Sequence, residues 1–463
     1  MKVAFRIPPS PAVVLTTVLA AGAATAEETA PATSAGDTAW VLTSAALVLM
    51  MTVPGLALFY GGLVRAKNIL SLLMQCLTCL ALVSVLWVVA GYSIAFGDDI
   101  GGGLLGDPVQ YLGLRGIDAS SASGSIPTYA FLVFQLMFAA ITPALITGAF
   151  AERMRFGAFV LFTALWSLLI YSPLCHWVWG PDGWLGARGA MDFAGGTVVH
   201  ISSGTAALVA ALLVGARRGF GREPMPPHNL PFTLAGAALL WVGWFGFNAG
   251  SALAADGAAA LAFVTTNTAA AAAALSWAVA EWLGRAGRPT LLGAATGAVA
   301  GLVAITPAAG FVAPWAALVI GAVAGVLCQR ACTLKTRLGY DDALDVVGVH
   351  GVGGTWGALA TGIFALEGGL VAGAGLGQLG EQALGVLATY AFAGIGTWLI
   401  LLFVRSVTPL RVEAEEEEMG LDLTEHSETA YATGPVGGHP VAAPSLATAP
   451  AEATAGAHRT REV

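Results

Sequence analysis

The sequence predicts an all-α polytopic membrane protein with eleven transmembrane helices. Two observations of composition lead to this fold class: 57% of the 463 residues are hydrophobic and only 10% are charged, whereas roughly 25% are charged in soluble domains. The third observation is a series of apolar segments of spanning length. The formal charge of -8 says little about partners, because the acidic residues cluster in a C-terminal tail and in loops. Nothing in the sequence indicates a nucleic-acid partner.

The first 26 residues are typical of a secretory signal peptide. Lys2 and Arg6 precede the apolar run 12–24, and Ala-Thr-Ala follows at 24–26. An apolar core this short, with small residues at the cleavage point, is typical of a signal peptide. We therefore expect the transmembrane domain to occupy residues 27–408, with the mature N-terminus outside. An uncleaved twelfth helix is the alternative.

Eleven apolar segments follow the signal peptide, and each has about the 20 residues that a helix needs to cross the hydrocarbon core. They lie at 40–64, 69–96, 127–151, 156–179, 194–215, 230–253, 258–283, 289–307, 312–333, 346–366 and 383–407. Several are interrupted by proline, at Pro54, Pro143, Pro173 and Pro307. Membrane helices tolerate such residues when neighbouring groups satisfy the freed backbone.

The basic residues indicate the orientation. An odd number of spans with the N-terminus outside makes every second loop cytoplasmic, and cytoplasmic loops carry an excess of Lys and Arg. The expected outer loops hold only Arg115 and Arg188. The expected inner loops hold Arg65, Lys67, Arg153, Arg155, Arg217, Arg218, Arg222, Arg285, Arg288, Arg330, Lys335, Arg337, Arg405 and Arg411. This distribution supports eleven spans with the C-terminus in the cytoplasm.

The first ten segments divide into two sets of five with opposite topology. Ile-Thr-Pro-Ala occurs at 141–144 in the third segment and again at 305–308 in the eighth. A histidine likewise occurs in the fifth segment, His200, and in the tenth, His350. Inverted repeats place a site at their interface near the middle of the bilayer. We expect an inverted 5+5 repeat plus a C-terminal helix, with both histidines at the interface of the halves.

These two histidines are the candidate functional residues. His200 ends the stretch 192–200 and His350 lies in the stretch 345–351, and each histidine enters an apolar helix. An ionisable side chain at membrane depth is expensive and by default marks a pathway or a proton site. Two separately satisfied polar residues in helix packing are one alternative, and axial ligands of a haem in a membrane redox protein are another.

The C-terminal region differs in composition from the rest of the chain. Residues 409–432 contain the acidic run 415–418 and then Gly420-Leu421-Asp422, and we expect them to form a cytoplasmic tail. Residues 433–463 are mostly Ala, Pro, Gly and Thr. A segment with so few large apolar residues is expected to be disordered.

Several long motifs occur in order along the chain, at 54–62, 192–200, 227–231, 244–251, 345–351 and 420–422. Together they resemble the ammonium transporter family, the Amt branch of the Amt/Rh superfamily, from about Trp40 to Tyr431. The resemblance implies an eleven-helix bundle with one pore in each protomer, assembled as a homotrimer. The sequence shows no nucleophile constellation and no metal-binding motif, so we expect neither an enzyme nor a cofactor.

By this resemblance, an outer mouth binds ammonium through Phe138, Trp179 and Ser251. Aromatic faces attract cations through their quadrupoles, and a hydroxyl can accept an N–H from the ion. Trp177 and Trp184 lie near Trp179 in the sequence and are the alternatives for the mouth tryptophan. The other residues that the resemblance assigns to the substrate path are Phe134, Gln135, Phe247, Trp244 and Asp192.

The resemblance also implies an order along the path. Phe138 and Phe247 match two stacked rings that close it, and an apolar plug blocks hydrated ions by dewetting. Below the rings, His200 and His350 are expected to share a proton and to conduct it, or to orient ammonia. We interpret Asp192 as a helix cap at the mouth, with direct coordination of the ion as the alternative. Asp345 is expected to be structural.

The leading hypothesis is therefore an ammonium transporter in the cytoplasmic membrane. By resemblance, the tail packs on neighbouring protomers and forms part of a docking surface for PII-type regulatory proteins. A neutral gas channel of the Rh type and an ammonium sensor are the alternatives that the resemblance leaves open.

Overall fold

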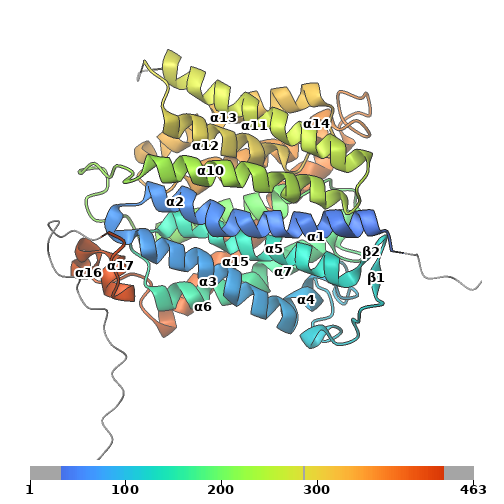
Figure 1. Cartoon of the computed structure of the whole chain (residues 1–463), viewed down its shortest axis with the longest axis horizontal. Helices are drawn as coiled ribbons and strands as arrows, with labels where there is room; N and C mark the ends of the chain where they lie inside the picture. Colours follow the sequence, from blue (N-terminus) through green and yellow to red (C-terminus); the bar gives the residue numbers. More distant parts are fainter. Residues whose placement is uncertain (1–32, 285–286, 432–463) are drawn as a thin grey trace, which may run out of the picture.

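The structure, a computed structural model, describes residues 33–284 and 287–431. The expected signal peptide at 1–26 and the segment 433–463 lie outside these residues. The long helices run roughly alongside one another (Figure 1). The helices of the acidic tail lie at one end of the bundle, and a short pair of strands lies at the opposite end.

The first half of the chain contains nine α-helices and a strand pair. The helices are α1 (Ala35–Met50), α2 (Ala57–Leu63), α3 (Ile69–Leu86), α4 (Tyr92–Phe96), α5 (Thr128–Phe150), α6 (Phe156–Trp166), α7 (Ser172–Trp179), α8 (Trp184–Ala187) and α9 (Ser202–Val214). The strands β1 (Ala122–Ser123) and β2 (Ile126–Pro127) pair antiparallel.

The second half contains five α-helices, followed by a long helix and the tail. They are α10 (Leu230–Trp244), α11 (Gly257–Leu283), α12 (Leu291–Ile305), α13 (Pro314–Leu338) and α14 (Val352–Phe364), then α15 (Gly377–Val407), α16 (Ala414–Met419) and α17 (Leu421–His426).

Short turns of π-helix and 3-10 helix join or separate the α-helices. The π turns are η1 (Met51–Leu56), η3 (Trp87–Gly91), η5 (Ser167–Tyr171), η6 (Gly196–Ile201), η7 (Phe245–Ala249) and η9 (Val347–Gly351). The 3-10 turns are η2 (Ala66–Asn68), η4 (Leu112–Leu114) and η8 (Gly250–Ala252).

The polytopic all-α fold is confirmed. Nine helical runs in the described part of the chain are long and apolar enough to cross a membrane. The other two expected segments are also helical: α12 is a shorter apolar helix, and Val347–Phe364 consists of η9 followed by α14. Each of the eleven predicted segments therefore corresponds to a helix, and eleven crossings remain the prediction.

Helix boundaries differ from the apolar segments where charged residues belong to a helix. α13 continues past the expected end at 333, through Lys335 and Arg337 to Leu338. Basic side chains are favourable in the last turn of a helix because of its dipole. Pro143, expected to interrupt the third segment, lies inside the continuous helix α5.

The two halves pack in corresponding pairs of helices, as an inverted repeat requires. α5 packs on α9 as α12 packs on α14, and α1 packs on α5 as α10 packs on α12. At the central seam α9 contacts η9, and α14 contacts η6. The approach is closest at Gly204 and Gly351, where a Cβ added to Gly204 would collide with the backbone of Gly351. Only glycine permits this contact.

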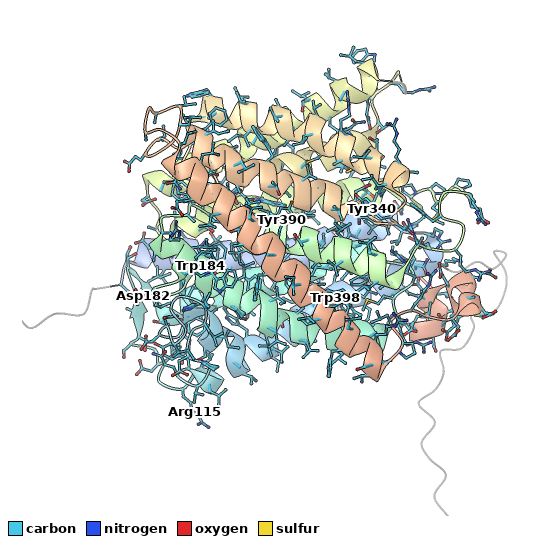
Figure 2. The ribbon with its side chains drawn as sticks, turned by 180° about the vertical axis from the view of Figure 1, so that it is seen from behind. Arg115, Asp182, Trp184, Tyr340, Tyr390 and Trp398 are labelled. Carbon is cyan, nitrogen blue, oxygen red and sulfur yellow. The ribbon has the colours of Figure 1, made fainter. Side chains whose placement is uncertain are left out.

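The two ends of the bundle carry different loops. Figure 2 shows α15 crossing the outside of the bundle, with Tyr390 and Trp398 along it. Arg115, Asp182 and Trp184 lie at one end and Tyr340 lies toward the other, where the tail packs. The loops that carry Arg115 and Asp182 therefore lie at the end of the bundle opposite the tail (Figure 2).

A cluster of buried charges joins four loops at the tail end. Glu152 contacts Arg65 at 2.6 Å and Arg217 at 3.4 Å, and Arg217 also contacts Asp341 at 2.8 Å. Burial alone would raise the pKa of Glu152, but the charges of Arg217 and Arg65 outweigh burial and hold the pKa below its usual value. Burial would likewise raise the pKa of Asp341, but its hydrogen bonds with Arg217 lower it. Both carboxylates are ionised at neutral pH and stabilise the fold in that form.

We expect Arg217→Gln to lower the free energy of unfolding by about 3 kcal/mol at pH 7, because it leaves two buried carboxylates without this partner. Their folded-state pKa values are lowered, so their stabilisation is present above the unfolded values of about 4 and is lost as the pH falls. The difference between wild type and variant should therefore shrink below about pH 4. Unfolding in detergent at several pH values measures this.

Arg218→Gln is the matched control. Arg218 pairs with Glu418, and both side chains are at least half exposed, so its loss should cost less than about 1 kcal/mol. An equal cost for both variants, or a cost at Arg217 that is independent of pH, would show that the cluster does not stabilise the fold.

Candidate transport pathway

Two phenyl rings, one from each half of the chain, stack on each other next to the histidine helix. Phe138 on α5 and Phe247 on η7 stack with ring centroids 4.1 Å apart and an interplanar angle of 26°. Each side chain is fully buried. Phe134, one turn before Phe138 on α5, packs edge-on against Phe138 with centroids 4.9 Å apart. The three rings form a continuous apolar barrier.

Trp179, at the end of α7, lies against this barrier. Its ring meets Phe138 edge-on at 6.0 Å, and its Nε1 donates a hydrogen bond of 2.8 Å to the Asp192 carbonyl. Trp177 instead donates to a loop carbonyl, and its ring packs on Trp184 and Phe392. Of the three neighbouring tryptophans, Trp179 is therefore the one that contacts the stacked rings.

Two polar side chains accompany the aromatic barrier. Ser251 Oγ donates a hydrogen bond of 2.8 Å to the Phe247 carbonyl, one turn earlier. This leaves the lone pairs of the hydroxyl oxygen to accept from a ligand. Gln135, next to Phe134 on α5, is buried, and its Oε1 has no hydrogen-bond partner in the described part of the chain. Both groups offer acceptor atoms.

The structure brings His200 and His350 together at the seam. Their Nδ1 atoms are 3.2 Å apart, and both side chains are buried. Two ring nitrogens at this distance require a single proton between them, so one ring donates and the other accepts. The contact leaves no space for a metal ion between the rings, which removes haem ligation by this pair.

Each histidine is held in the same local structure. His200 lies in η6 and His350 in η9, and the residue five positions earlier, Gly195 or Asp345, has a positive φ, of 114° or 65°. Asp tolerates this left-handed conformation better than most residues, and the Asp345 carboxylate pairs with Lys335 at 2.7 Å. Both features are consistent with a structural role for Asp345.

Aromatic and aliphatic groups surround the histidine pair. The Trp244 ring stacks on His200 with centroids 5.5 Å apart, and its Nε1 donates to the Thr306 hydroxyl. A cavity of about 10 Å³ lies between Phe247 and the two histidines. Roughly 10–15 Å³ is the least that holds one water molecule. Apart from the imidazoles, the space is lined by apolar groups and is narrow enough for one small molecule.

Beyond His350 the pathway opens toward the tail end of the bundle. A cavity of about 320 Å³ reaches His350 and is lined by charged side chains, including Arg217, Glu281, Lys335 and Asp345. A polar vestibule of this size is hydrated. His350 therefore lies between a narrow apolar passage and an aqueous one.

Asp192 caps the helix that carries His200. Its Oδ1 accepts from the N–H groups of Gly195 and Gly196, and its Oδ2 accepts from the backbone and hydroxyl of Thr197 and from the N–H of Val198. Burial raises the pKa of the Asp192 carboxyl, and these hydrogen bonds oppose the rise. The first turn of the helix depends on this carboxylate for its partners.

Asp342 is the counterpart of Asp192 in the second half, and it is not among the site residues expected from the sequence. Asp342 Oδ2 accepts a hydrogen bond of 2.7 Å from Val347 N, five residues on, as Asp192 Oδ2 does from Thr197. Each aspartate also lies eight residues before its histidine, and this equal spacing is the signal that could have identified it. Burial raises the pKa of Asp342 to about 6. Unlike Asp192, its other oxygen has no partner in the described residues.

The fold and this arrangement define a class: a polytopic α-helical membrane protein in which two histidines meet at the seam of its two halves. The chain belongs to the Ammonium Transporter Family, whose model matches residues 39–431. It is 52% identical to an ammonium transporter of Bacillus subtilis over 407 residues, covering 86% of this chain and 98% of the relative. It is 49% identical to an ammonium transporter of Aquifex aeolicus over 402 residues, covering 86% and 93%.

Solved structures agree with this family. The crystal structure of Saccharomyces cerevisiae Mep2 matches with a TM-score of 0.78 and 38% identity, covering 83% of this chain and 89% of that one. A structure titled Sensor Amt Protein matches with a TM-score of 0.79 and 34% identity, covering 84% and 98%.

We expect Asp192→Asn to destabilise the fold more than Asp342→Asn. Both oxygens of Asp192 accept hydrogen bonds. In the Asn variant an N–H₂ group replaces one of these oxygens and leaves its buried N–H donors without an acceptor, which should lower the free energy of unfolding by about 2 kcal/mol. Asn at 342 can still accept from Val347 N and should cost less than about 1 kcal/mol. Thermal unfolding of both variants in detergent tests this, and an equal loss of stability would contradict it.

Proposed function

We propose that this chain takes up ammonium across the cytoplasmic membrane by binding NH₄⁺ at the outer mouth, deprotonating it and passing NH₃ through the apolar passage, with the proton conducted separately. One observation carries the proposal. The stacked rings of Phe138 and Phe247 lie next to a histidine pair, and a cavity with room for one small molecule is lined by Phe247 and both histidines. The names of the relatives support ammonium as the substrate.

The mouth matches the chemistry of a small cation with hydrogens to donate. The aromatic groups Phe138 and Trp179 supply cation–π attraction of about 0.5–2 kcal/mol each. The Ser251 oxygen, whose hydrogen is already donated to the Phe247 carbonyl, accepts an N–H from the ion. Sodium and potassium ions have no hydrogen to donate.

The ring barrier separates ammonium from potassium by chemistry more than by size. A hydrated ion does not enter a dewetted apolar passage, but ammonium can lose a proton and continue as neutral ammonia. Potassium has no such neutral form. Movement of the Phe138 and Phe247 rings then admits a single uncharged molecule.

The histidine pair provides the only imidazoles of the described passage. His200 Nε2 is buried, has no hydrogen-bond partner among the described residues and lines the small cavity, so it is available to ammonia. The two rings share one proton between their Nδ1 atoms, so this proton can shift from one ring to the other. A pair in which both rings are charged is disfavoured by burial and repulsion. A proton entering at one ring therefore leaves from the other, toward the hydrated vestibule beyond His350.

The proposal includes the orientation and the trimeric assembly that the family resemblance implies. The mouth faces the outside and the charged cluster faces the cytoplasm, since the basic loops gather at the end of the tail. The exposed apolar faces of the bundle contact lipid and neighbouring protomers in a homotrimer, with one pathway in each chain.

Replacement of His200 or His350 by Ala should lower ammonium current at least about 10-fold without unfolding the bundle, because it removes the proton relay from an apolar passage. Current in proteoliposomes on a solid-supported membrane after an ammonium jump measures this. A potassium jump is the control for selectivity, and Ser203→Ala, on the same helix, is the control for substitution. Unchanged current in both histidine variants would reject the proton relay.

The same recording separates the competing functions. Rapid internal alkalinisation without current would indicate a neutral gas channel of the Rh type. Saturable ammonium binding with neither current nor alkalinisation would indicate a sensor. Saturable current that is absent with potassium supports the proposal.

The tail is held on the cytoplasmic face by specific contacts. In α17, Asp422 Oδ1 accepts from Ser71 N at 2.8 Å, and Leu421 N donates to Asn68 Oδ1 at 2.9 Å. In α16, the buried Glu417 pairs with Arg411 and also accepts from Arg218 N. The tail therefore joins several cytoplasmic loops, and we propose that this surface forms part of the docking site of a PII-type regulatory protein.

Deletion of the chain from Glu413 should lower ammonium current and reduce the melting temperature by at least about 3 °C, because it leaves the partners of Glu417 and Asp422 unsatisfied. The matched control ends after Tyr431 and keeps all of these contacts. If the deletion and the control have equal current and equal binding of a PII-type protein, the tail has neither role.

A further inference from the structure

A fully buried histidine outside the pathway lies one turn before the mouth tryptophan. His176 belongs to α7 and is 0% exposed, and Trp179 follows it three residues later on the same helix. Its Nδ1 lies 3.0 Å from the Ala95 carbonyl of α4, and its Nε2 lies 3.4 Å from Asp99 Oδ1. The imidazole thus links the outer ends of the second and fourth membrane segments.

Both neighbours of the imidazole are acceptors. Asp99 Oδ1 also accepts from Gly103 N at 2.7 Å and from Gly101 N at 3.2 Å. Burial acts to raise the pKa of Asp99, but these hydrogen bonds and that of His176 outweigh it and lower the pKa. The carboxylate is therefore ionised and anchors its own loop as well as the ring.

The backbone after Trp179 is pressed against this histidine. A Cβ added to Gly180 would collide with His176 Nδ1 and with the Ala95 carbonyl, and a Cβ added to Gly183 would collide with the His176 carbonyl. The position of the imidazole therefore determines where the chain leaves α7, directly next to Trp179.

The same outer loop contacts the surrounding tryptophans. Trp177 Nε1 donates to the Leu104 carbonyl at 2.9 Å, and Trp184 N donates to the Gly103 carbonyl at 3.1 Å. The Trp179 indole makes a separate contact, a hydrogen bond that it donates to the Asp192 carbonyl. Trp179 is thus held through its backbone by the His176 contact and through its ring by the cap of the histidine helix.

We propose that His176, held by Asp99 and the Ala95 carbonyl, is a positioning residue that sets the Trp179 indole against Phe138 and so determines how tightly the mouth captures ammonium. The inference rests on the proposed function, since it assigns the capture step to Trp179. His176 itself does not touch the substrate. Its loss should weaken capture and leave passage through the histidine pair intact.

The test is the dependence of the proteoliposome current on ammonium concentration. His176→Ala should raise the half-saturating concentration about 5-fold while the maximal current stays within about 2-fold, the loss expected for one weakened cation–π contact. His176→Gln keeps an N–H that can reach the Ala95 carbonyl and should recover part of the loss. Asp99→Asn should give a smaller rise.

Two further variants separate positioning from other effects. Asp98→Asn removes the same charge from the same rim, but Asp98 is exposed and does not contact the imidazole, so it should not change half-saturation. In a Trp179→Leu background, His176→Ala should add no further rise, because contacting residues in one unit are not additive.

The outcomes decide the inference separately from the proposed function. A wild type without ammonium-specific current would reject the proposed function. A wild type with saturable current, but with unchanged half-saturation in His176→Ala or with a full effect in the Trp179→Leu background, would reject only the role of His176. If His176→Ala does not fold, His176→Gln and Asp99→Asn decide, and unchanged half-saturation in both overturns the inference.

Discussion

The contact between two histidine-bearing turns is the interaction on which the rest of the structure depends. Nδ1 atoms of His200 and His350 meet at 3.2 Å only because η6 and η9 approach closely at the seam of the two halves. Gly204 makes this approach possible, since a Cβ at this position would collide with the backbone of Gly351. Burying two polar rings in an apolar bundle costs free energy unless each ring hydrogen-bonds the other. The close approach of the helices at the seam is therefore what allows both histidines to be buried there.

The aspartates that precede the two turns show how this seam is kept in place. Asp192 satisfies the first N–H groups of the helix of His200 with both oxygens, and Asp342 does the same with one oxygen for the helix of His350. Helix ends buried in a membrane protein have no water to satisfy their N–H groups. The hydrogen bonds that a carboxylate accepts from these groups therefore offset the cost of burying it. The two halves thus cap their histidine helices with aspartates at corresponding positions.

Contacts at the two ends of the bundle restrict how the pathway can move. At the outer end, Trp179 is tied to Asp192 by its ring and to the second membrane segment through His176. At the tail end, the loops after α5 and α9 are tied by the Glu152 and Arg217 charges and covered by the tail. The stacked rings of Phe138 and Phe247 pack between Trp179 and the histidine pair.

The sequence by itself determined the class of fold, the order of the segments and the two histidines, because hydrophobic length, basic loops and isolated ionisable residues are local properties. Resemblance added Phe138, Phe247, Ser251 and Trp179, which composition alone does not distinguish from lipid-facing aromatics. Only the tertiary structure decided that Asp342 rather than Asp345 caps its helix, and that His176 lies between the Ala95 carbonyl and Asp99. The Asp342 contact spans only five residues, but which aspartate reaches the N–H groups depends on the backbone conformation between them. The contacts of His176 join segments about 80 residues apart and follow from helix packing, not from a local pattern.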